Sequence, residues 1–278
     1  MTSSIITADS SWRDTILEIK KWGQPVEPQK TIGAKGRVSF EVLNHTLIFD
    51  MRWPIVYSKP NTSWLYMAAE PMWVIFGSNK LSLFPEIARI QGPYSDNGIS
   101  TYGAYGPQYK RQKNYIIDIL NKDRNTRQAV MGIWRKNPQA MKDIPCTVSL
   151  QWVIRNGSIH TIVSMRSSDA GMGLPYDMLT FVCMTAEIAA QLQEPVDLGK
   201  CWITAGSRHI YEDQWDKLEG LGDHPDDRYH SWNVWKWPAI RLVLENLANI
   251  NTDTLNRLDV QMEARNAILG ASGGKTNA

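Results

Sequence analysis

The 278-residue sequence contains few cysteines, no long apolar run and almost no net charge. Its three cysteines, Cys146, Cys183 and Cys201, form no CxxC pair, which argues against a disulfide framework or a zinc site and for a reducing compartment. Acidic and basic residues are interspersed, and the net charge is +2, so the chain lacks the clustered positive charge that is typical of nucleic-acid-binding proteins. No apolar run reaches about 18 residues, and no signal-peptide pattern is visible. We therefore expect a soluble cytoplasmic protein that contacts no membrane and holds no metal.

The sequence does contain enough apolar and aromatic material for a large core. A hydrophobic fraction of 43%, with 12 Trp and 10 Tyr, excludes a disordered chain. At this length we predict one mixed α/β domain over residues 1–269, followed by a disordered Gly/Ser/Lys/Asn tail over residues 270–278. Within the domain we expect a strand, a turn near Asn44-His45 and a second strand over residues 37–49, and mostly helix over residues 239–269.

The clearest local pattern is a β-hairpin over residues 146–166. Residues 148–153 alternate and are rich in β-forming residues, Asn156-Gly157 is a strong hairpin-turn signal, and residues 160–165 return as the partner strand. The hairpin places Cys146 at the start of one strand and Arg166 at the end of the next, so the two side chains can share a pocket. A nearby guanidinium favours the nucleophilic thiolate. A lone cysteine can equally be buried and unreactive.

Other candidate residues are ambiguous when each is taken alone. Glu70 lies in an apolar helix predicted over residues 63–76, where its carboxylate either faces solvent or is held for chemistry with a raised pKa. Lys30 and Lys35 lie in a Gly/Lys loop that is either an anion clamp or a solvated turn. His209 and Tyr211 follow a predicted buried strand at residues 201–205, where a histidine can be structural or bind a ligand.

Taken together, these positions resemble a known family. Pro145-Cys146, followed by Arg166-Ser167-Ser168-Asp169 and then Gly173-Leu174-Pro175-Tyr176-Asp177, is similar to the signature of the thymidylate synthase superfamily. The likeness covers roughly residues 10 to 220, and it is strongest from 143 to 211. It implies an α/β (α+β) thymidylate synthase-like fold, with a large mixed β-sheet flanked by helices and with sheets packed back to back in a homodimer. That arrangement follows from the resemblance and not from periodicity.

The resemblance also implies a role for each matching residue. Cys146 adds to carbon 6 of a pyrimidine, Glu70 orders the catalytic water and handles protons, and Tyr105 is the tyrosine of the pocket. Arg166 and Ser167 bind the nucleotide phosphate, together with Lys30 or Lys35 and with Arg127 reaching across the dimer interface. Arg124 either substitutes for the second arginine of that interface or is an ordinary surface residue. His209 and Tyr211 bind the sugar, and Asp169 contacts the base or the folate. The implied co-substrate is 5,10-methylenetetrahydrofolate.

Three departures from the synthase pattern point to a different product. Asp177 stands where synthases have asparagine, and Gln91 and Tyr94 replace two tryptophans that wall the reactive carbon of the folate. The apolar C-terminus that closes over the folate has no visible counterpart. Gln91 is small and polar enough to admit water, and Glu70 can act as its general base. A carboxylate at 177 can accept a hydrogen bond from the amino group of cytosine, whereas it opposes the carbonyl oxygen of uracil.

The sequence therefore predicts a cytosine-nucleotide 5-hydroxymethylase, with dCMP as the first-choice substrate and with Glu70, Gln91, Tyr94 and Asp169 on the folate side. Three alternatives stay open at this point. CMP can replace dCMP, because small changes of pocket shape decide whether a 2′-hydroxyl is accepted. The chain can be a divergent thymidylate synthase that methylates dUMP. It can also be a catalytically silent nucleotide-binding dimer, although this would leave Cys146, Glu70, Tyr105 and Arg166 together unexplained.

Overall fold

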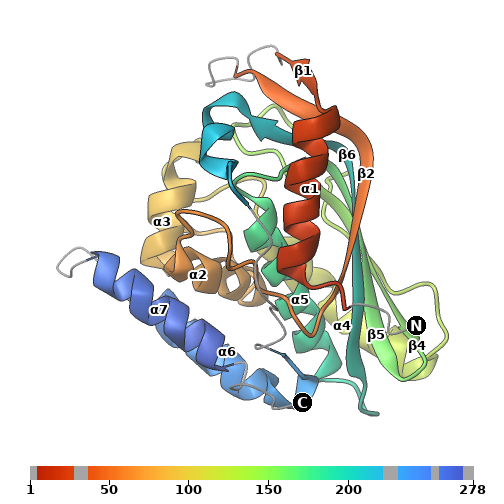
Figure 1. Cartoon of the computed structure of the whole chain (residues 1–278). Helices are drawn as coiled ribbons and strands as arrows, with labels where there is room; N and C mark the ends of the chain where they lie inside the picture. Colours follow the sequence, from red (N-terminus) through yellow and green to blue (C-terminus); the bar gives the residue numbers. More distant parts are fainter. Residues whose placement is uncertain (1–4, 28–36, 222–230, 252–256, 272–278) are drawn as a thin grey trace.

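A mixed six-stranded sheet forms the centre of the molecule (Figure 1), in a computed structural model that describes residues 5–27, 37–221, 231–251 and 257–271. The strand order is β1-β2-β6-β5-β4-β3. Only β5 and β6 run parallel among the described strands, and the other pairs are antiparallel. The strands are β1 (Gln24–Val26), β2 (Ser39–Asp50), β3 (Val130–Gly132), β4 (Thr147–Arg155), β5 (Ser158–Asp169) and β6 (Asp197–Tyr211). The predicted mixed sheet is confirmed.

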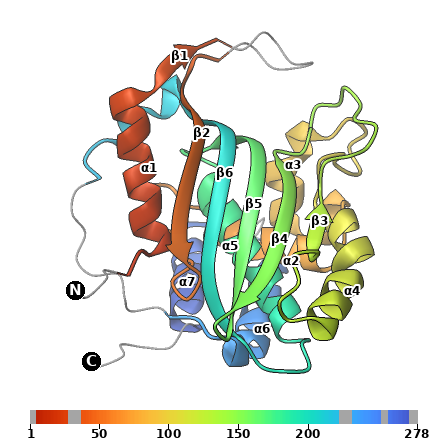
Figure 2. The ribbon, with the colours of Figure 1, turned by 90° about the vertical axis from the view of Figure 1, so that its right-hand side faces the viewer.

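Helices cover one face of this sheet and its edges (Figure 2). They are α1 (Ala8–Trp22), α2 (Trp64–Ile75), α3 (Pro85–Gln91), α4 (Gly106–Lys122), α5 (Leu174–Ala189), α6 (Trp237–Ala248) and α7 (Arg257–Ala271). Single 3₁₀ turns occur at Leu81–Leu83, Gly92–Tyr94, Glu212–Gln214, Asp216–Leu218 and Val234–Lys236. No described helix crosses the other face of the sheet, which is turned towards the viewer in Figure 2. No helix in the described ranges has the length and apolarity that a membrane crossing requires.

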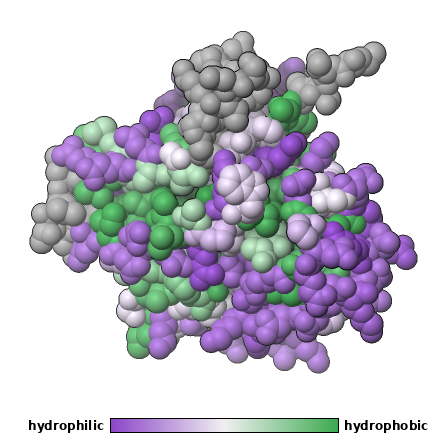
Figure 3. All heavy atoms as spheres, turned by 90° about the horizontal axis from the view of Figure 1, so that it is seen from below, coloured by the Kyte–Doolittle hydropathy of each residue, from purple (hydrophilic) through white to green (hydrophobic). Residues whose placement is uncertain are grey.

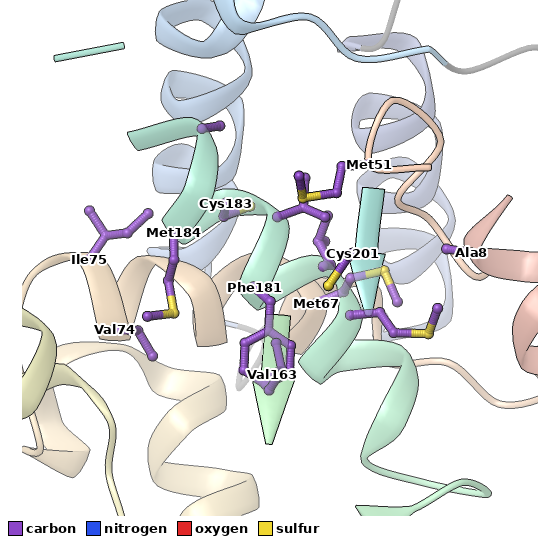
Figure 4. Packing of buried hydrophobic residues seen from close by; sticks show 14 of the residues in the cluster. Ala8, Met51, Met67, Val74, Ile75, Val163, Phe181, Cys183, Met184 and Cys201 are labelled. Atoms are coloured by element: carbon purple, nitrogen blue, oxygen red, sulfur yellow. The ribbon is translucent and has the colours of Figure 1, made fainter. Parts of the chain in front are cut away.

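Helix α5 fills the space between the sheet and α2. Nearly all of its residues are buried, which is typical of a helix that is apolar on every side. Figure 4 shows Phe181 and Cys183 of α5 in the same core as Val163 of β5 and Cys201 of β6. Cys183 and Cys201 are fully buried and free, so they are core residues.

The predicted hairpin is present as β4 and β5. Asn156 and Gly157 both have positive φ, at 52° and 76°, which the two-residue turn between right-twisted strands requires. The strands pair from Thr147↔Met165 to Arg155↔Ser158, and the Arg166 N–H donates to the Cys146 carbonyl over 2.8 Å. The hairpin therefore brings Cys146 beside Arg166.

Two local predictions need correction. Residues 37–49 do not form two strands, because Ser39–Asp50 is one strand that pairs with β6 on both sides of Asn44. Asn44 does have a turn-like φ of 51°, which the strand accommodates as a local kink. The C-terminal segment forms two helices, and α7 extends through Ala271, so the first two residues assigned to the disordered tail are helical. Residues 272–278 and the loop with Lys30 and Lys35 lie outside the described residues.

Helices α6 and α7 pack against α2, which carries Glu70. Gln261 of α7 accepts hydrogen bonds from the Trp64 and Leu65 N–H groups at 2.6 and 3.2 Å, so it satisfies two of the free amides at the start of α2. On their outer side the two helices expose Leu242, Leu258 and Met262. Figure 3, a view from below, shows apolar side chains gathered among hydrophilic ones on this end of the molecule.

Glu187 of α5 fixes α6 from the core side. Its carboxylate, only 7% exposed, accepts hydrogen bonds from Trp237 Nε1 at 2.8 Å and from Arg241 Nη1 at 3.0 Å. We expect Glu187→Ala to lower the free energy of unfolding by about 2–3 kcal/mol, because it leaves an indole N–H and a guanidinium without their buried acceptor. Denaturant unfolding measures this loss, and hydrogen exchange should locate it in residues 237–248.

The matched control is Glu245→Ala, which removes the other carboxylate that binds the same arginine. The Arg241–Glu245 pair is partly exposed and spaced i, i+4, so its loss should lower the free energy of unfolding by only about 0.3–0.5 kcal/mol. Equal effects of the two substitutions would show that Glu187 does not anchor α6.

Candidate active site

A cavity of about 500 Å³ opens where α2, α3, the start of α5 and the loop before β4 meet. This volume is within the range of small-molecule sites. Seven of the residues predicted for catalysis, base recognition or folate binding line it, and they are Glu70, Gln91, Tyr94, Tyr105, Cys146, Asp169 and Asp177. Segments that are far apart in the sequence thus bring these seven predicted residues to one pocket.

The Cys146 thiol lies beside the Arg166 guanidinium, as predicted. Arg166 Nη2 is 3.8 Å from Cys146 Sγ, and the same side chain donates to the carbonyls of Ile144 and Pro145 at 2.9 and 3.0 Å. The arginine therefore fixes the loop that carries the thiol. Burial raises the pKa of Cys146 to about 11 even though Arg166 lowers it, so desolvation outweighs the guanidinium in the free protein. The expected effect of the guanidinium on the thiol is therefore present, but burial is the larger effect.

Tyr105 is placed by two polar contacts. The Gly103 N–H donates to Asp143 Oδ2 over 2.9 Å, which anchors the segment just before Tyr105. The buried Thr147 hydroxyl donates to the Tyr105 hydroxyl over 3.0 Å. Thr147 follows Cys146 directly, so the residue next to the thiol also orients the phenol of the pocket.

Glu70 is the centre of a short hydrogen-bonded network. Its Oε1 accepts from the Tyr66 hydroxyl at 2.7 Å, and its Oε2 accepts from Thr180 Oγ1 at 3.1 Å. Gln91 Nε2 donates in turn to the Tyr66 hydroxyl over 2.5 Å. Burial raises the pKa of Glu70 to about 7, against the two hydrogen bonds, which lower it. Of the two alternatives for this carboxylate, the structure therefore favours the one held in the pocket, with a pKa suited to proton transfer near neutrality.

Asp177 presents its carboxyl to the cavity from the first turn of α5. No described side chain or backbone amide donates a hydrogen bond to it. Burial raises its pKa well above the usual range, and the charges of Glu70 and Asp169 act in the same direction, while Arg208 lowers it. The carboxyl is therefore available to a ligand and tends to hold a proton.

Asp169 is partly committed to local structure. Its Oδ1 accepts from the N–H groups of Gly171 and Met172 at 2.9 and 3.0 Å, which shapes the loop before α5. Burial raises its pKa to about 6. Only Oδ2 is free of these backbone bonds, so a ligand can be bound there.

Four of the residues predicted to hold phosphate and sugar are not among those that line the cavity, and they are Arg166, Ser167, His209 and Tyr211. His209 is next to Asp169 in the β5–β6 pairing, and its ring packs edge-on against Tyr211 with centroids 5.0 Å apart. Ser167 pairs with Ser207 in the same two strands. Arg127 is exposed on the loop between α4 and β3, so within one chain the structure does not bring it to the thiol.

Several residues of the site were not singled out from the sequence. Tyr66, Lys59 and Arg89 line the cavity, and Arg208 is fully buried, with Nη1 2.6 Å from Ser168 Oγ. Only Tyr66 had a visible signal, because it is four residues before Glu70 and therefore on the same helix face. The positions of Lys59, Arg89 and Arg208 at the site depend on tertiary packing, which the local sequence does not show. Within the described residues, no three acidic, histidine or cysteine side chains are grouped to hold a metal ion.

Comparison with known proteins gives a family match and several partial relatives. A family model described as thymidylate synthase matches residues 11–225. The chain is 26% identical over 131 residues to a thymidylate synthase of Bacillus subtilis subsp. natto, covering 47% of this chain and 46% of the relative. It is 27% identical over 118 residues to a bifunctional dihydrofolate reductase-thymidylate synthase of Paramecium tetraurelia, covering 41% of this chain and 25% of the relative.

A third relative has a different printed activity. The chain is 32% identical over 123 residues to a deoxyuridylate hydroxymethyltransferase of Delftia phage PhiW-14, covering 38% of this chain and 34% of that protein. The matched regions therefore span between a quarter and about half of these relatives. The family model covers most of the chain, including the cavity with its cysteine, arginine and glutamate, so the chain belongs to the thymidylate synthase family.

Proposed function

We propose that this chain attaches a hydroxymethyl group to carbon 5 of a cytosine nucleotide, with dCMP as the first-choice substrate and CMP as the alternative. The observation that carries the proposal is the Asp177 carboxyl, which faces the cavity without a partner among the described residues. The proposal also rests on Gln91, which lines the same cavity and is bonded to the glutamate network.

Asp177 fits the Watson–Crick edge of cytosine. Its raised pKa favours a protonated carboxyl, whose O–H can donate to the bare ring nitrogen while its carbonyl oxygen accepts from the amino group. Once ionised, the same carboxyl would oppose the carbonyl oxygen of uracil. An unpaired buried polar group costs about 1–3 kcal/mol, which corresponds to roughly five- to 150-fold discrimination.

Hydroxymethylation of dUMP is the second candidate, and two observations favour it. The phage relative is named a deoxyuridylate hydroxymethyltransferase. A protonated Asp177 can also pair with uracil, because its O–H can donate to the carbonyl oxygen while its own carbonyl accepts from the ring N–H. Discrimination against uracil therefore depends on the ionised form of Asp177.

The other side chains have roles that follow from their positions. The Cys146 thiolate would add to carbon 6, with the Arg166 guanidinium at 3.8 Å stabilising its charge. Arg166, Ser167 and a partner chain's Arg127 would bind phosphate, and His209 and Tyr211 would bind the sugar. Glu70, with a pKa of about 7, would take the proton of the attacking water.

Methylenetetrahydrofolate would supply the one-carbon unit, as in the family. The cavity suits such a ligand, because it has the exposed ring of Tyr94 for stacking and the polar groups of Gln91 and Asp169 for hydrogen bonds. Gln91 stands where an indole would keep water out, so the residues of this chain allow a water molecule near Glu70. That water would make the product hydroxymethyl instead of methyl.

We further propose that two copies pack through the open sheet face. Ile48 of β2, Trp202 of β6 and Ile162 of β5 are neighbours across three strands on that face, and Ile162 is 38% exposed. An apolar row on a sheet without covering helices is typical of an interface. This packing would allow Arg127 to act on the partner's site.

The reaction can be tested by incubating the protein with dCMP, CMP and dUMP in turn, each with methylenetetrahydrofolate, and weighing the nucleotide product. The proposal predicts that a cytosine nucleotide gains the mass of one CH2O unit. Gain of CH2O on dUMP alone would favour the second candidate. Gain of CH2 on dUMP, with dihydrofolate released, would identify a methylating synthase.

The role of Asp177 can be tested by replacing its carboxyl group with an amide. We expect Asp177→Asn to reduce kcat/KM for the cytosine nucleotide, relative to dUMP, by tenfold or more, because an amide presents donor and acceptor to uracil. Asp118→Asn removes an exposed carboxylate on α4 and is the matched control, with no change expected. An Asp177→Asn protein that still prefers cytosine would refute base recognition by this residue.

The rate should depend on the ionisation of Glu70. A general base must be unprotonated, so kcat/KM for hydroxymethyl formation should rise with pH through about 7 and level off above it. Thr180→Val removes a hydrogen bond that lowers the pKa of Glu70, and it should therefore move this limb to higher pH. The limb should vanish in Glu70→Gln, and its persistence there would assign it to another group.

The proposed interface can be tested by placing a charge in the apolar row. Ile162→Glu should convert a dimer into monomers in sedimentation equilibrium, because the interface would bury a carboxylate without a partner. Leu242→Glu is the control, since Leu242 is 58% exposed on α6, a helix on the opposite side of the sheet (Figure 1). A dimer that persists in Ile162→Glu would exclude this face as the interface.

A further inference from the structure

Tyr66 connects two groups that the proposed reaction needs. It is one helical turn before Glu70 on α2, so both side chains point to the same side. Its ring is 3% exposed, and its hydroxyl lies between Glu70 Oε1 at 2.7 Å and Gln91 Nε2 at 2.5 Å. The contact joins α2 to the end of α3, which are 25 residues apart at these positions.

The chemistry of the phenol fixes the direction of this chain of hydrogen bonds. A tyrosine hydroxyl has one proton, and an ionised carboxylate can only accept, so Tyr66 donates to Glu70. The bond from Gln91 must then be donated by its NH2 group. This sets the orientation of the amide, and its carbonyl oxygen and second N–H are left for other partners in the cavity.

Packing holds the tyrosine ring in this position. The Tyr66 ring meets Tyr176 edge-on, with centroids 5.0 Å apart and an interplanar angle of 85°. The Tyr176 hydroxyl accepts from the Ser63 N–H over 2.9 Å, at the residue that caps α2. The ring is therefore held from its side and from the start of its own helix, as a group with a positioning role must be.

We propose that Tyr66 is a positioning residue that sets Gln91 and Glu70 in one arrangement for the capture of water. The proposal rests on the hydroxymethylation proposed above and names the residue that controls its last step. In that step the water oxygen bonds to the exocyclic methylene carbon attached to carbon 5, and the water proton goes to Glu70. The π electron pair of the exocyclic double bond moves to re-form the double bond between carbons 5 and 6, and the bond from carbon 6 to sulfur breaks to release the Cys146 thiolate.

Without the phenol hydroxyl, Gln91 loses its fixed amide orientation and Glu70 loses one of its two donors. The steps before the methylene intermediate do not use this arrangement, so loss of the proton from carbon 5 should continue. The intermediate should then survive longer and react with other nucleophiles. A small thiol such as 2-mercaptoethanol can serve as the competing nucleophile.

The test uses Tyr66→Phe, which keeps the ring and removes only the hydroxyl. The nucleotide carries tritium at carbon 5, the reaction contains methylenetetrahydrofolate and millimolar 2-mercaptoethanol, and the hydroxymethyl and thioether products are separated. In Tyr66→Phe the ratio of hydroxymethyl to thioether product should fall roughly ten- to a hundredfold, the effect of one hydrogen bond to a charged group. Tritium release should fall by less.

Two further variants separate positioning from a general effect on the fold. Thr180→Val removes the other donor to Glu70 without touching Gln91, so its product ratio reports the effect through Glu70 alone, and the fall in Tyr66→Phe should be clearly larger. Gln91→Ala should change the ratio as Tyr66→Phe does, and the double variant should be no worse than either, because the two residues act as one unit.

The outcomes distinguish the two proposals. If the wild-type protein releases no tritium from any nucleotide, the proposed function fails, and the role of Tyr66 fails with it. If tritium is released but Tyr66→Phe keeps the wild-type product ratio, or if the effects of Tyr66→Phe and Gln91→Ala multiply, then only the positioning role is wrong.

Discussion

The site depends on the register of β4 and β5. The bond from the Arg166 N–H to the Cys146 carbonyl, at 2.8 Å, continues the hairpin ladder up to the residue that carries the thiol. A slip of one residue in a strand turns every side chain to the opposite face, so it would move the cysteine out of the cavity. The Asn156-Gly157 turn sets the register from Arg155↔Ser158 to Ser149↔Ser164, because both turn residues have the positive φ that a two-residue turn needs. A bulge between Thr147 and Ser149 then shifts the pairing by one residue, so the turn and the bulge together position Cys146.

The electrostatics of the cavity are dominated by desolvation. Burial raises the pKa of Cys146, Glu70, Asp169 and Asp177, and the positive charges nearby are too few to reverse this. Three carboxyls and a thiol close together cannot all be charged in a low-dielectric site. These groups are therefore less ionised in the free protein than they would be in water, and a bound phosphate and base would change that balance.

Much of the fold and of the site could be predicted from the sequence, and the exceptions have physical causes. The hairpin, the apolar helix with Glu70 and the buried strand at 201–205 follow from local patterns that packing did not override. The kink at Asn44 looked like a turn, because local sequence does not show that β6 pairs with β2 on both sides of it. The hydrogen bond between Gln91 and Tyr66 depends on how α3 packs on α2, and the hydrophobic periodicity of the sequence contains no information about that packing. Lys30 and Lys35 remain predictions.

The cap on α2 has a consequence for how the protein is made. The amides of Trp64 and Leu65 are bound by Gln261, a residue 197 and 196 positions further along the chain. A ribosome that has completed the sheet has not yet synthesised this acceptor, and a contact of such sequence separation also forms late in folding from the whole chain. In a growing chain, the hairpin that carries Cys146 is therefore complete before the acceptor that caps the helix of Glu70.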